Sequence, residues 1–596
     1  MSDDQVVEPV VARLPRRRHR VPAWVWFGLV VVVVLLAWDG VRAWQIQRSL
    51  GRAESDISQL RTDLDASTWS ALIPDANRLA SDSHAAAAAT HDPLWVLTTH
   101  LPWVGSNPRE VSVVARALST VARQGAVPLT RSRTLTVVAS HDAGLPQLIA
   151  SFESDRPAIA SAVAAVTQAN ANVQSLHTGD LLPFVRRRVV SSQLKLSRAT
   201  NEISNVGRLA IAAPPLLGQD RPQTLLLLFQ TPAEPRGTGG LVGAWGELRT
   251  DKGAVSLVAF GANDDLPNVP TLPAGVNPEI ATNFGADIQL HQNFNLSASF
   301  PDAAQIFAAS WTAGPGNGVH PDAVLSIDPV ALGELLTVIG PVDTASGVEI
   351  NADNAADELL RKEYYTFTST DQTQRVAFLG DVTKSVFDRV TAKQYAVGAL
   401  GRALASMAGQ RRLLVWSADA VDQQQWDGLG ISGALGPPSS TAVRVAVNSL
   451  DGSKLGAYLK TSAVVANCGS PGPLVTLTFA SEAPAELPDY PSTHVVGLDA
   501  TTMRLSFSLY LSPAWGVRSV SVAGQPIGFA SGTESGWRLI RGVVDVPRAS
   551  SVVADVQLVG GHGASEVSAI SVQPQAIPVV SGITPGAAGG ANRCAS

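Results

Sequence analysis

An uncharged apolar segment near the N-terminus constrains the fold of this chain most. Residues Val21–Trp38 carry no charged side chain, and a helix of this length spans about 27 Å, close to the hydrocarbon thickness of a bilayer. A basic run at 13–20 precedes the segment, and tryptophans lie near both of its ends. Because arginines remain on the cytoplasmic side and indole rings favour the headgroup level, the sequence predicts one membrane-spanning helix with the C-terminus outside the cytoplasm.

A cleaved signal peptide is the alternative interpretation, with Val41-Arg42-Ala43 as the cleavage site. The apolar core of a signal peptide has about 7–15 residues, which is shorter than this segment. We therefore expect a basic cytoplasmic tail at 1–20 and an uncleaved transmembrane helix at 21–43. No second apolar stretch of this length follows in the sequence. The rest of the chain is then expected outside the plasma membrane of the cell, with the lipid bilayer as its first partner.

The charge balance gives no indication of a nucleic-acid partner. The 596 residues have a net charge of -6, and only 16% of them are charged. After the N-terminal run, the sequence contains no basic stripe interleaved with aromatic residues. A chain of this length accommodates several domains of about 100–200 residues each.

Residues 44–215 show a helical pattern. Ile46, Leu50 and Ile57 recur at spacings of four and seven residues, with charged residues between them, which is typical of an amphipathic helix. We interpret the region as an extracytoplasmic helical stalk. Its simplest role is that of a spacer or dimer stalk without chemistry.

In residues 216–467 the sequence pattern changes to one of alternating strands and helices. The run Thr224–Gln230 is short and continuously apolar, as expected of a strand buried on both faces. Further strands are predicted at 254–258, 323–327, 413–416 and 442–447, and helices at 303–311, 329–339, 354–361 and 373–389. This alternation predicts an α/β sheet domain covered on both faces, with Asp328 as the cap of the helix that starts at Pro329.

In residues 468–575 the apolar residues no longer recur at helical spacing. Short β-rich runs alternate with Gly, Pro and Ser turns, which is typical of a β-sandwich. The Gly/Ala-rich tail at 576–596 is expected to be flexible. The predicted fold class is thus a multidomain α+β chain with a single N-terminal transmembrane helix, a helical stalk, an α/β domain and a C-terminal β-sandwich.

The chain has two cysteines, Cys468 and Cys594. Outside the cytoplasm they are able to form a disulfide that ties the tail to the end of the α/β domain. Two free thiols are the alternative.

The glycine-rich segment Thr231–Glu247 is the first candidate for ligand binding. It directly follows a predicted buried strand, and ligands bind at the carboxyl ends of strands in open α/β sheets. Gly239 and Gly240 allow a backbone to approach a ligand, and Arg236 offers a planar fork suited to phosphate or carboxylate. The alternative is a tight turn with an ion pair between Arg236 and Glu234.

A second candidate group consists of Arg361, Asp371 and Arg375. Asp371 has the position of a helix N-cap, and Arg375 lies one turn into the helix that follows. Several arginines that converge on one cleft would neutralise a pyrophosphate, and a carboxylate would hold Mg²⁺ through water. A local salt bridge between Asp371 and Arg375 is the alternative.

Two common catalytic patterns are absent from the sequence. No two histidines after the apolar segment lie within five residues of each other, so the sequence has no local histidine pair for a metal. There is also no Gly-x-Ser-x-Gly motif, which argues against an α/β-hydrolase.

The run Ala233–Gly240 resembles the AE-x-R-x-TGG motif of a bacterial, actinobacterial-type family of membrane-anchored proteins catalogued as domain of unknown function 4012. Further agreement extends over 216–460, for example at Phe300-Pro301 and Gly340-Pro341-Val342. On these motifs the chain is identified as a member of that family. The family name implies no activity.

The order of elements also resembles that of the LytR-CpsA-Psr phosphotransferases, which move a glycopolymer from a polyprenyl-pyrophosphate carrier onto peptidoglycan. Arg236-Gly237-Thr238 lies where their early Arg-x-Asp-Thr motif falls, and Arg361, Asp371 and Arg375 resemble their later Arg and Asp-x-x-Arg. The resemblance implies that the three arginines hold the pyrophosphate. It also implies a catalytic Asp371 that orients an arginine or Mg²⁺.

Two hypotheses follow for the function. In the first, an envelope protein binds a polyprenyl-pyrophosphate-linked glycan and transfers it to the cell wall, with a ligand site made of Glu234, Arg236, Gly239, Gly240, Arg361 and Arg375. In the second, the protein is a non-catalytic envelope scaffold or receptor for protein or glycan partners. The absence of the early aspartate, replaced here by glycine or threonine, favours the second hypothesis.

Overall fold

The computed structural model describes residues 23–66, 68–102, 105–140, 143–392, 395–468, 472–560 and 566–584. Within the first helix it describes the side chains of Trp38 and of residues 40–64. The fold is mixed α+β, with helices and several sheets, which confirms the predicted multidomain α+β class. The chain divides into two compact units, Met1–Thr130 with Ser161–Asn201, and Arg131–Ala160 with Glu202–Ser596.

Helix α1 (Ala23–Asp65) opens the described chain. The side chains of the predicted membrane segment Val21–Trp38, apart from Trp38 itself, lie outside the described residues. Among the residues that are described, none of the helices combines the length and the hydropathy of a membrane span.

The first unit is helical. Ile46 of α1 is buried and Leu50 is half-buried, as the amphipathic pattern predicts. Its core uses small side chains such as Ala86 and Ala115, which let helices approach closely. The elements that follow α1 in this unit are α2 (Trp69–Ala89), α3 (Pro93–Thr98), α4 (Ser106–Thr120), the π-helical η1 (Val121–Ala126) and α5 (Val127–Thr130).

Two long helices, α7 (Leu145–Gln174) and α8 (Pro183–Leu216), contribute residues to both units. Helix α6 (Arg133–Ala139) belongs to the second unit. All regular elements described between 44 and 216 are helices, in agreement with the predicted pattern.

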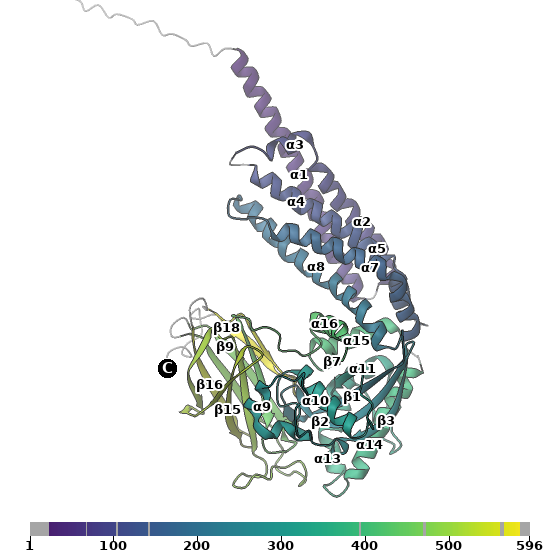
Figure 1. The fold of residues 1–596 in the computed structure, drawn as a ribbon. Helices are drawn as coiled ribbons and strands as arrows, with labels where there is room; N and C mark the ends of the chain where they lie inside the picture. The colour runs from purple at the N-terminus through teal and green to yellow at the C-terminus, as the bar shows by residue number, and fades with distance from the viewer. Residues whose placement is uncertain are drawn as a thin grey trace, which may run out of the picture. The chain divides into compact units, whose positions relative to one another are not determined.

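A mixed five-stranded sheet forms the α/β part of the second unit (Figure 1). Strands β1 and β4 are parallel, and the other neighbouring pairs are antiparallel. The strand order is β3–β2–β1–β4–β7, with bounds β1 (Gln223–Arg236), β2 (Gly239–Asp251), β3 (Ala254–Ala262), β4 (Ala323–Ile327) and β7 (Leu414–Ser417).

Apolar cores lie on both faces of this sheet. Leu226 of β1 belongs to the core that contains α10 (Phe300–Ala313), whereas its neighbour Leu227 belongs to the core on the opposite face with Phe387 of α14 (Gln372–Thr391). A sheet covered on both faces is what the sequence predicts. Burial on both sides explains why the run in β1 is apolar without alternation.

The remaining elements of the α/β part are short or helical. Strand β4 and helix α11 (Pro329–Ile339) have the predicted bounds, and Oδ1 of Asp328 accepts a hydrogen bond from the Ala331 amide as the predicted cap. The others are η2 (Asn263–Asp265), α9 (Glu279–Phe284), η3 (Gly285–Gln289), η4 (His291–Asn293), β5 (Val342–Asp343), β6 (Glu349–Ile350), α12 (Ala355–Asp357), η5 (Glu358–Lys362), α13 (Glu363–Thr366), α15 (Val397–Gly409) and α16 (Ala420–Leu429).

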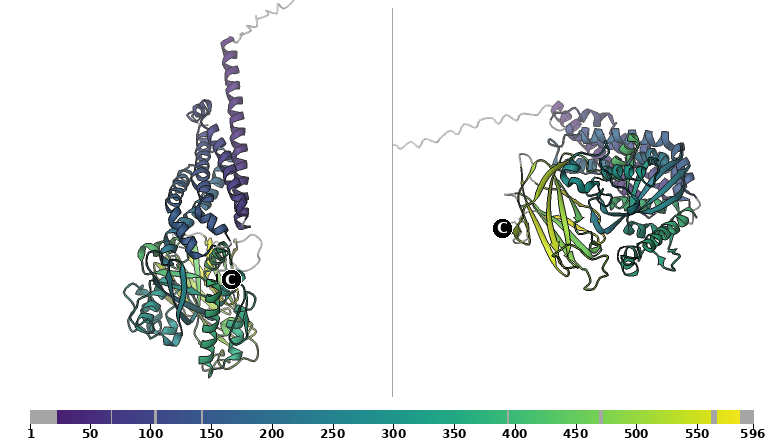
Figure 2. Two further views of the ribbon diagram at one scale, coloured as in Figure 1. Left: turned by 90° about the vertical axis from the view of Figure 1, so that its right-hand side faces the viewer. Right: turned by 60° about the horizontal axis from the view of Figure 1, so that its bottom comes forward.

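Two further sheets pack face to face as a β-sandwich, drawn in green to yellow in Figure 2. Side chains of both sheets, such as Leu477 and Phe507, share one core. The sheets have the orders β13–β12–β16–β10–β9–β18 and β14–β15–β11–β8–β17. The strands are β8 (Ala442–Ser449), β9 (Leu459–Ala466), β10 (Leu474–Ser481), β11 (Met503–Leu511), β12 (Trp515–Val522), β13 (Gln525–Pro526), β14 (Ala530–Glu534), β15 (Trp537–Val546), β16 (Ser551–Gly560), β17 (Ala569–Val572) and β18 (Val580–Thr584), and η6 (Leu455–Tyr458) precedes β9.

The sandwich uses strands from both sides of its predicted bounds. Strand β8, which the sequence placed in the α/β sheet, pairs with β11 of the sandwich. Strand β18 lies in the predicted flexible tail, yet it pairs with β9. Cys468, at the end of β9, is disulfide-bonded, and its predicted partner Cys594 lies outside the described residues.

Candidate functional site

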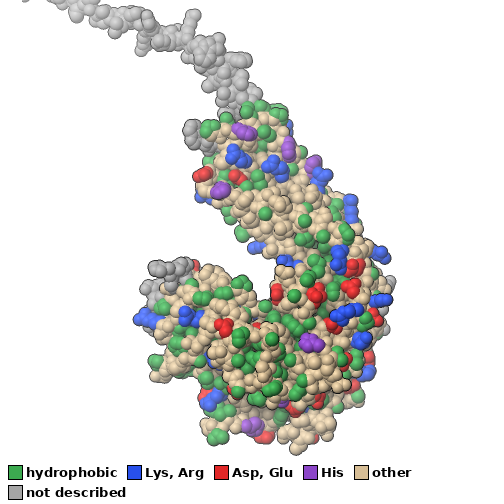
Figure 3. All heavy atoms as spheres, viewed as in Figure 1, with side chains coloured by type: hydrophobic (Ala, Val, Ile, Leu, Met, Phe, Trp, Pro, Cys, Tyr) green, Lys and Arg blue, Asp and Glu red, His purple; other side chains and the backbone are tan. Residues whose placement is uncertain are grey.

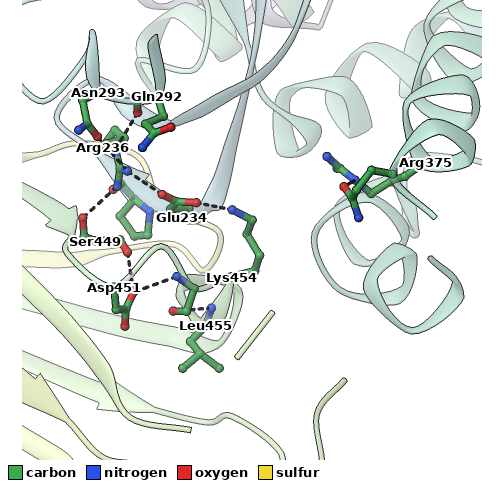
Figure 4. A network of polar contacts seen from close by, with 12 residues as sticks. Glu234, Arg236, Gln292, Asn293, Arg375, Ser449, Asp451, Lys454 and Leu455 are labelled. Atoms are coloured by element: carbon green, nitrogen blue, oxygen red, sulfur yellow. Dashed lines mark hydrogen bonds and ion pairs between the residues drawn. The ribbon is translucent and has the colours of Figure 1, made fainter. Parts of the chain in front are cut away.

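A buried ion-pair network lies at the end of β1 (Figure 4). Oε1 of Glu234 accepts a hydrogen bond from Arg236 at 2.6 Å, and Oε2 pairs with Lys454 of the sandwich. The exposed fraction of each of these side chains is 8% or less. Burial acts to raise the pKa of Glu234, but the charges of Lys454 and Arg236 outweigh it, and the pKa is lowered. The network therefore keeps Glu234 ionised and ties β1 to the sandwich.

Arg236 uses all of its hydrogen-bond donors within the protein. A guanidinium group has five N–H donors. They reach the carbonyls of Gln292 at 3.3 Å, Pro235 at 3.1 Å and Ser449 at 3.0 Å, the Glu234 carboxylate, and Oδ1 of Asn293 at 3.3 Å. This arrangement is the ion-pair alternative of the sequence analysis. A phosphate at Arg236 would have to displace protein acceptors.

The glycine-rich segment Thr231–Glu247 forms two strands joined by a tight turn, in agreement with the tight-turn alternative of the sequence analysis. Strand β1 continues to Arg236 and β2 begins at Gly239, which leaves a two-residue turn. A Cβ atom on Gly240 would lie 2.2 Å from the backbone of Thr231. Gly239 has a positive φ of 148°. Both glycines serve the close packing of this hairpin.

Arg375 forms a second pair, with Glu363. Figure 4 shows Arg375 apart from the Arg236 network. The Nη1 atom of Arg375 lies 3.4 Å from Oε1 of Glu363. The centre of the Tyr490 ring lies 5.9 Å from the Arg375 guanidinium carbon and 5.9 Å from Nζ of Lys454, within the range of cation–π interactions. Burial raises the pKa of Glu363 to about 7, although the charge of Arg375 opposes the shift. This acid is therefore only partly ionised at neutral pH.

Arg361 and Asp371 make local contacts. Arg361 donates to the Ala457 carbonyl at 2.7 and 3.2 Å and to Asp357 at 3.3 Å. The Asp371 carboxylate accepts hydrogen bonds from the hydroxyl of Thr368 at 2.6 Å and its amide at 3.0 Å, and these lower the pKa of Asp371. Asp371 occupies the N-cap position of α14, as predicted, but its side chain makes no capping hydrogen bond to the helix.

The magnesium role that the resemblance implies for Asp371 does not fit these residues. Its carboxylate is held by Thr368, and it does not line the cavity described below. Within the described part of the chain, no group of three or more His, Cys, Asp and Glu side chains is arranged to hold a metal ion.

A large apolar cavity of about 860 Å³ lies within the second unit, against the face of the sheet that carries α14. Aliphatic and aromatic side chains of β1, β4, α8, α14 and α15 make most of its wall, for example Leu227, Leu325 and Phe387. Val206 and Leu209 of α8 line it and remain 39% and 40% exposed. The volume falls in the range of about 300–1,000 Å³ that is typical of ligand pockets.

Charged side chains enter this cavity at one edge of the sheet. Asp328 directly follows β4, and Arg411 precedes β7, whose Leu414 pairs with Ser326 near the carboxyl end of β4. Glu363 and Arg375 also line the cavity, while Glu234, Arg236 and Arg361 do not. Ligands of open α/β sheets bind outside the carboxyl ends of the strands. The cavity, rather than the glycine turn, occupies this position.

Sequence inspection missed Lys454, Glu363 and Arg411 as members of these groups. Lys454 follows its partner Glu234 by 220 residues, so local spacing gives no signal. Glu363 stands in a run of charged residues that is typical of a solvated helix face. Arg411 could have been found from the sequence, because it lies two residues before the predicted strand at 413–416.

Residues 220–364 match the model of a family described as Protein of unknown function (DUF4012). This segment is a DUF4012 domain. The match confirms the family that the motifs indicate, over a shorter stretch than 216–460. The DUF4012 segment contains Glu234, Arg361 and Glu363, whereas Arg375 and Arg411 lie beyond it. Searches of curated proteins and of solved structures gave no match.

Proposed function

We propose that this chain is a membrane-anchored protein of the cell envelope whose α/β domain binds the apolar chain of a polyprenyl-phosphate-type lipid. The observation that carries the proposal is the apolar cavity of about 860 Å³ with charged groups at the carboxyl edge of the sheet. An apolar cavity is a poor site for water and a good one for hydrocarbon. The basic run and the apolar segment Val21–Trp38 support the anchor and the extracytoplasmic location.

The geometry supports binding better than group transfer. Arg236, which the resemblance to LytR-CpsA-Psr enzymes assigns to the pyrophosphate, has its donors occupied by protein acceptors. Asp371, the implied catalytic residue, contacts Thr368. Of the three arginines Arg236, Arg361 and Arg375, Arg375 alone lines the cavity. A lipid-carrier protein that holds or presents the chain accounts for these contacts.

The test uses a glycine that faces open space. Gly401 of α15 lines the cavity, and a Cβ atom there would meet no other atom within 4 Å. Gly401 is exposed at this wall, so Gly401→Trp is expected to obstruct the cavity without disturbing the fold. Gly51→Trp is the matched control, because Gly51 is also a helical glycine with open space around it and lies in the first unit.

The measurement is calorimetric titration of the full-length protein in lipid nanodiscs with farnesol, a soluble prenyl chain. We expect saturable binding by the wild type and by Gly51→Trp, and at least a tenfold loss in Gly401→Trp, which is about 1.4 kcal/mol. Equal affinities of all three proteins, or no saturable binding by a folded wild type, would contradict the proposal. The absence of saturable binding by a folded wild type would favour the scaffold hypothesis.

A further inference from the structure

The charges in the cavity wall are not balanced. Four of the lining residues are charged: Asp328, Glu363, Arg375 and Arg411. Asp328 is neutralised by a buried ion pair with Arg412, which also donates to the Gln575 carbonyl at 2.8 Å. Glu363 and Arg375 pair with each other. One cationic side chain, Arg411, is left over.

Arg411 has no acidic partner within the described part of the chain. None of the described carboxylates lies within ion-pair distance of its guanidinium. Burial and the nearby charge of Arg444 lower the pKa of Arg411 to about 10. A guanidinium stays charged at this pKa, so an unpaired cation is held at the wall of an apolar cavity. Arg411 is half-buried and loses part of its hydration without gaining an ionic partner, and a bound anion would offset the cost of that partial desolvation.

The backbone at Arg411 is also unusual. Its φ of 59° lies in the left-handed region, which residues other than glycine rarely adopt. The residue follows the end of α15 at Gly409 and comes just before β7. The side chain is thereby placed at the same edge of the sheet as Asp328. Strained conformations of this kind are kept where the surrounding structure fixes them.

We propose that Arg411 binds the anionic head group of the ligand whose apolar chain occupies the cavity. The ligand is then a single-chain amphiphile with a phosphate head, for which the planar guanidinium fork is well suited. This inference rests on the proposed function and adds to it the residue that recognises the head group.

The test compares two ligands that share a chain and differ in the head group. Farnesyl phosphate and farnesol are titrated separately into the full-length protein in nanodiscs, with inorganic phosphate as a third ligand. For the variant Arg411→Gln we expect a 10- to 100-fold weaker affinity for farnesyl phosphate and an affinity for farnesol within twofold of wild type. Arg411→Lys, which keeps the charge, is expected to recover part of the loss.

Arg402→Gln is the matched control, because Arg402 is an exposed arginine of α15 that does not line the cavity. It is expected to leave both affinities unchanged.

If Arg411→Gln weakened the affinities for both prenyl ligands equally, or weakened neither affinity, the inference would be wrong. Equal affinities of the wild type for the two prenyl ligands would also overturn the inference about Arg411, but they would leave the proposed function intact. Failure of both ligands to bind the wild type would overturn the proposed function itself. Binding of inorganic phosphate as tight as that of farnesyl phosphate would contradict an amphiphile site.

Discussion

Arg236 and Glu234 form an ion pair of 2.6 Å, with each side chain only 5% exposed, at the position where the sequence indicated a ligand-binding turn. The pair connects β1 to Lys454 and to the Ser449 carbonyl of the sandwich. The residues that the family motif singles out therefore hold two parts of the second unit together. The cavity that we assign to the ligand is lined by other residues.

The first prediction concerns the stability of this network. Arg236→Ala leaves Glu234 buried with one cation fewer and removes the donors of several buried carbonyls. Breaking a buried ion pair by removing one partner costs about 3–5 kcal/mol. We expect a loss of this size in the free energy of unfolding, measured by urea denaturation of the full-length protein.

A surface pair provides the comparison. Arg504 and Asp545 are bonded at 2.8 Å but are 36% and 38% exposed. Arg504→Ala is expected to cost about 0–1 kcal/mol, because exposed ion pairs contribute little. If Arg236→Ala were as mild as Arg504→Ala, Arg236 would not be a structural clamp.

The second prediction separates the packing role of the glycines from a role in ligand binding. A Cβ atom on Gly240 would lie 2.2 Å from the Thr231 backbone, whereas one on Gly243 would come no closer than 3.8 Å, to the Thr231 side chain. Gly240→Ala is therefore expected to destabilise the protein by about 1–3 kcal/mol through overpacking. Gly243→Ala, on the same strand, is expected to be tolerated.

The measurement is the thermal unfolding midpoint of both variants beside their affinity for farnesol. A Gly240→Ala variant with wild-type stability and lost affinity would show that the turn binds the ligand after all.

The third prediction is a pH dependence of stability that arises from Glu534. This carboxyl group is buried and bonded to Ser297 and to the Tyr510 hydroxyl at 3.2 Å. Burial raises its pKa to about 7, and the charges of Asp302 and Glu279 add to the shift. Arg541 also faces it.

The sign follows from the raised pKa. Below the ordinary value of 4.5, Glu534 is protonated in the folded and the unfolded chain, and its contribution to stability is complete. As the pH rises from 4.5 to 7, the unfolded chain ionises first, and about 3 kcal/mol is lost. We expect Glu534→Gln to gain stability relative to wild type by about this amount between pH 4.5 and 7.5, as measured by denaturation at each pH. A difference between the two proteins that does not change with pH would contradict this.

The elements that depend on local patterns were predictable. Strand β4 and helix α11 have the expected bounds, because a short apolar run and an Asp-Pro start are local signals. The apolar run of β1 also indicated correctly that the sheet is covered on both faces. These features need no knowledge of distant partners.

The pairing of distant strands was not predictable. The pattern of β8 is compatible with either sheet, and only its register with β11 places it in the sandwich. The role of Arg236 was not predictable for the same reason. It depends on the burial of Arg236 and on the pairing of Glu234 with Lys454, which is distant in the sequence. A sequence motif marks a residue as special without saying whether it packs or binds.

The central claim is that a prenyl chain occupies the cavity, and photo-crosslinking tests it most directly. The full-length protein in nanodiscs would be labelled with a farnesyl phosphate that carries a diazirine on its chain, and the labelled peptides would be mapped by mass spectrometry. We predict labels in the cavity-lining parts of α14 and α15, at 379–390 and 400–409, competed by farnesyl phosphate and lost in Gly401→Trp. Labels confined to other surfaces, or unchanged in that variant, would contradict the account.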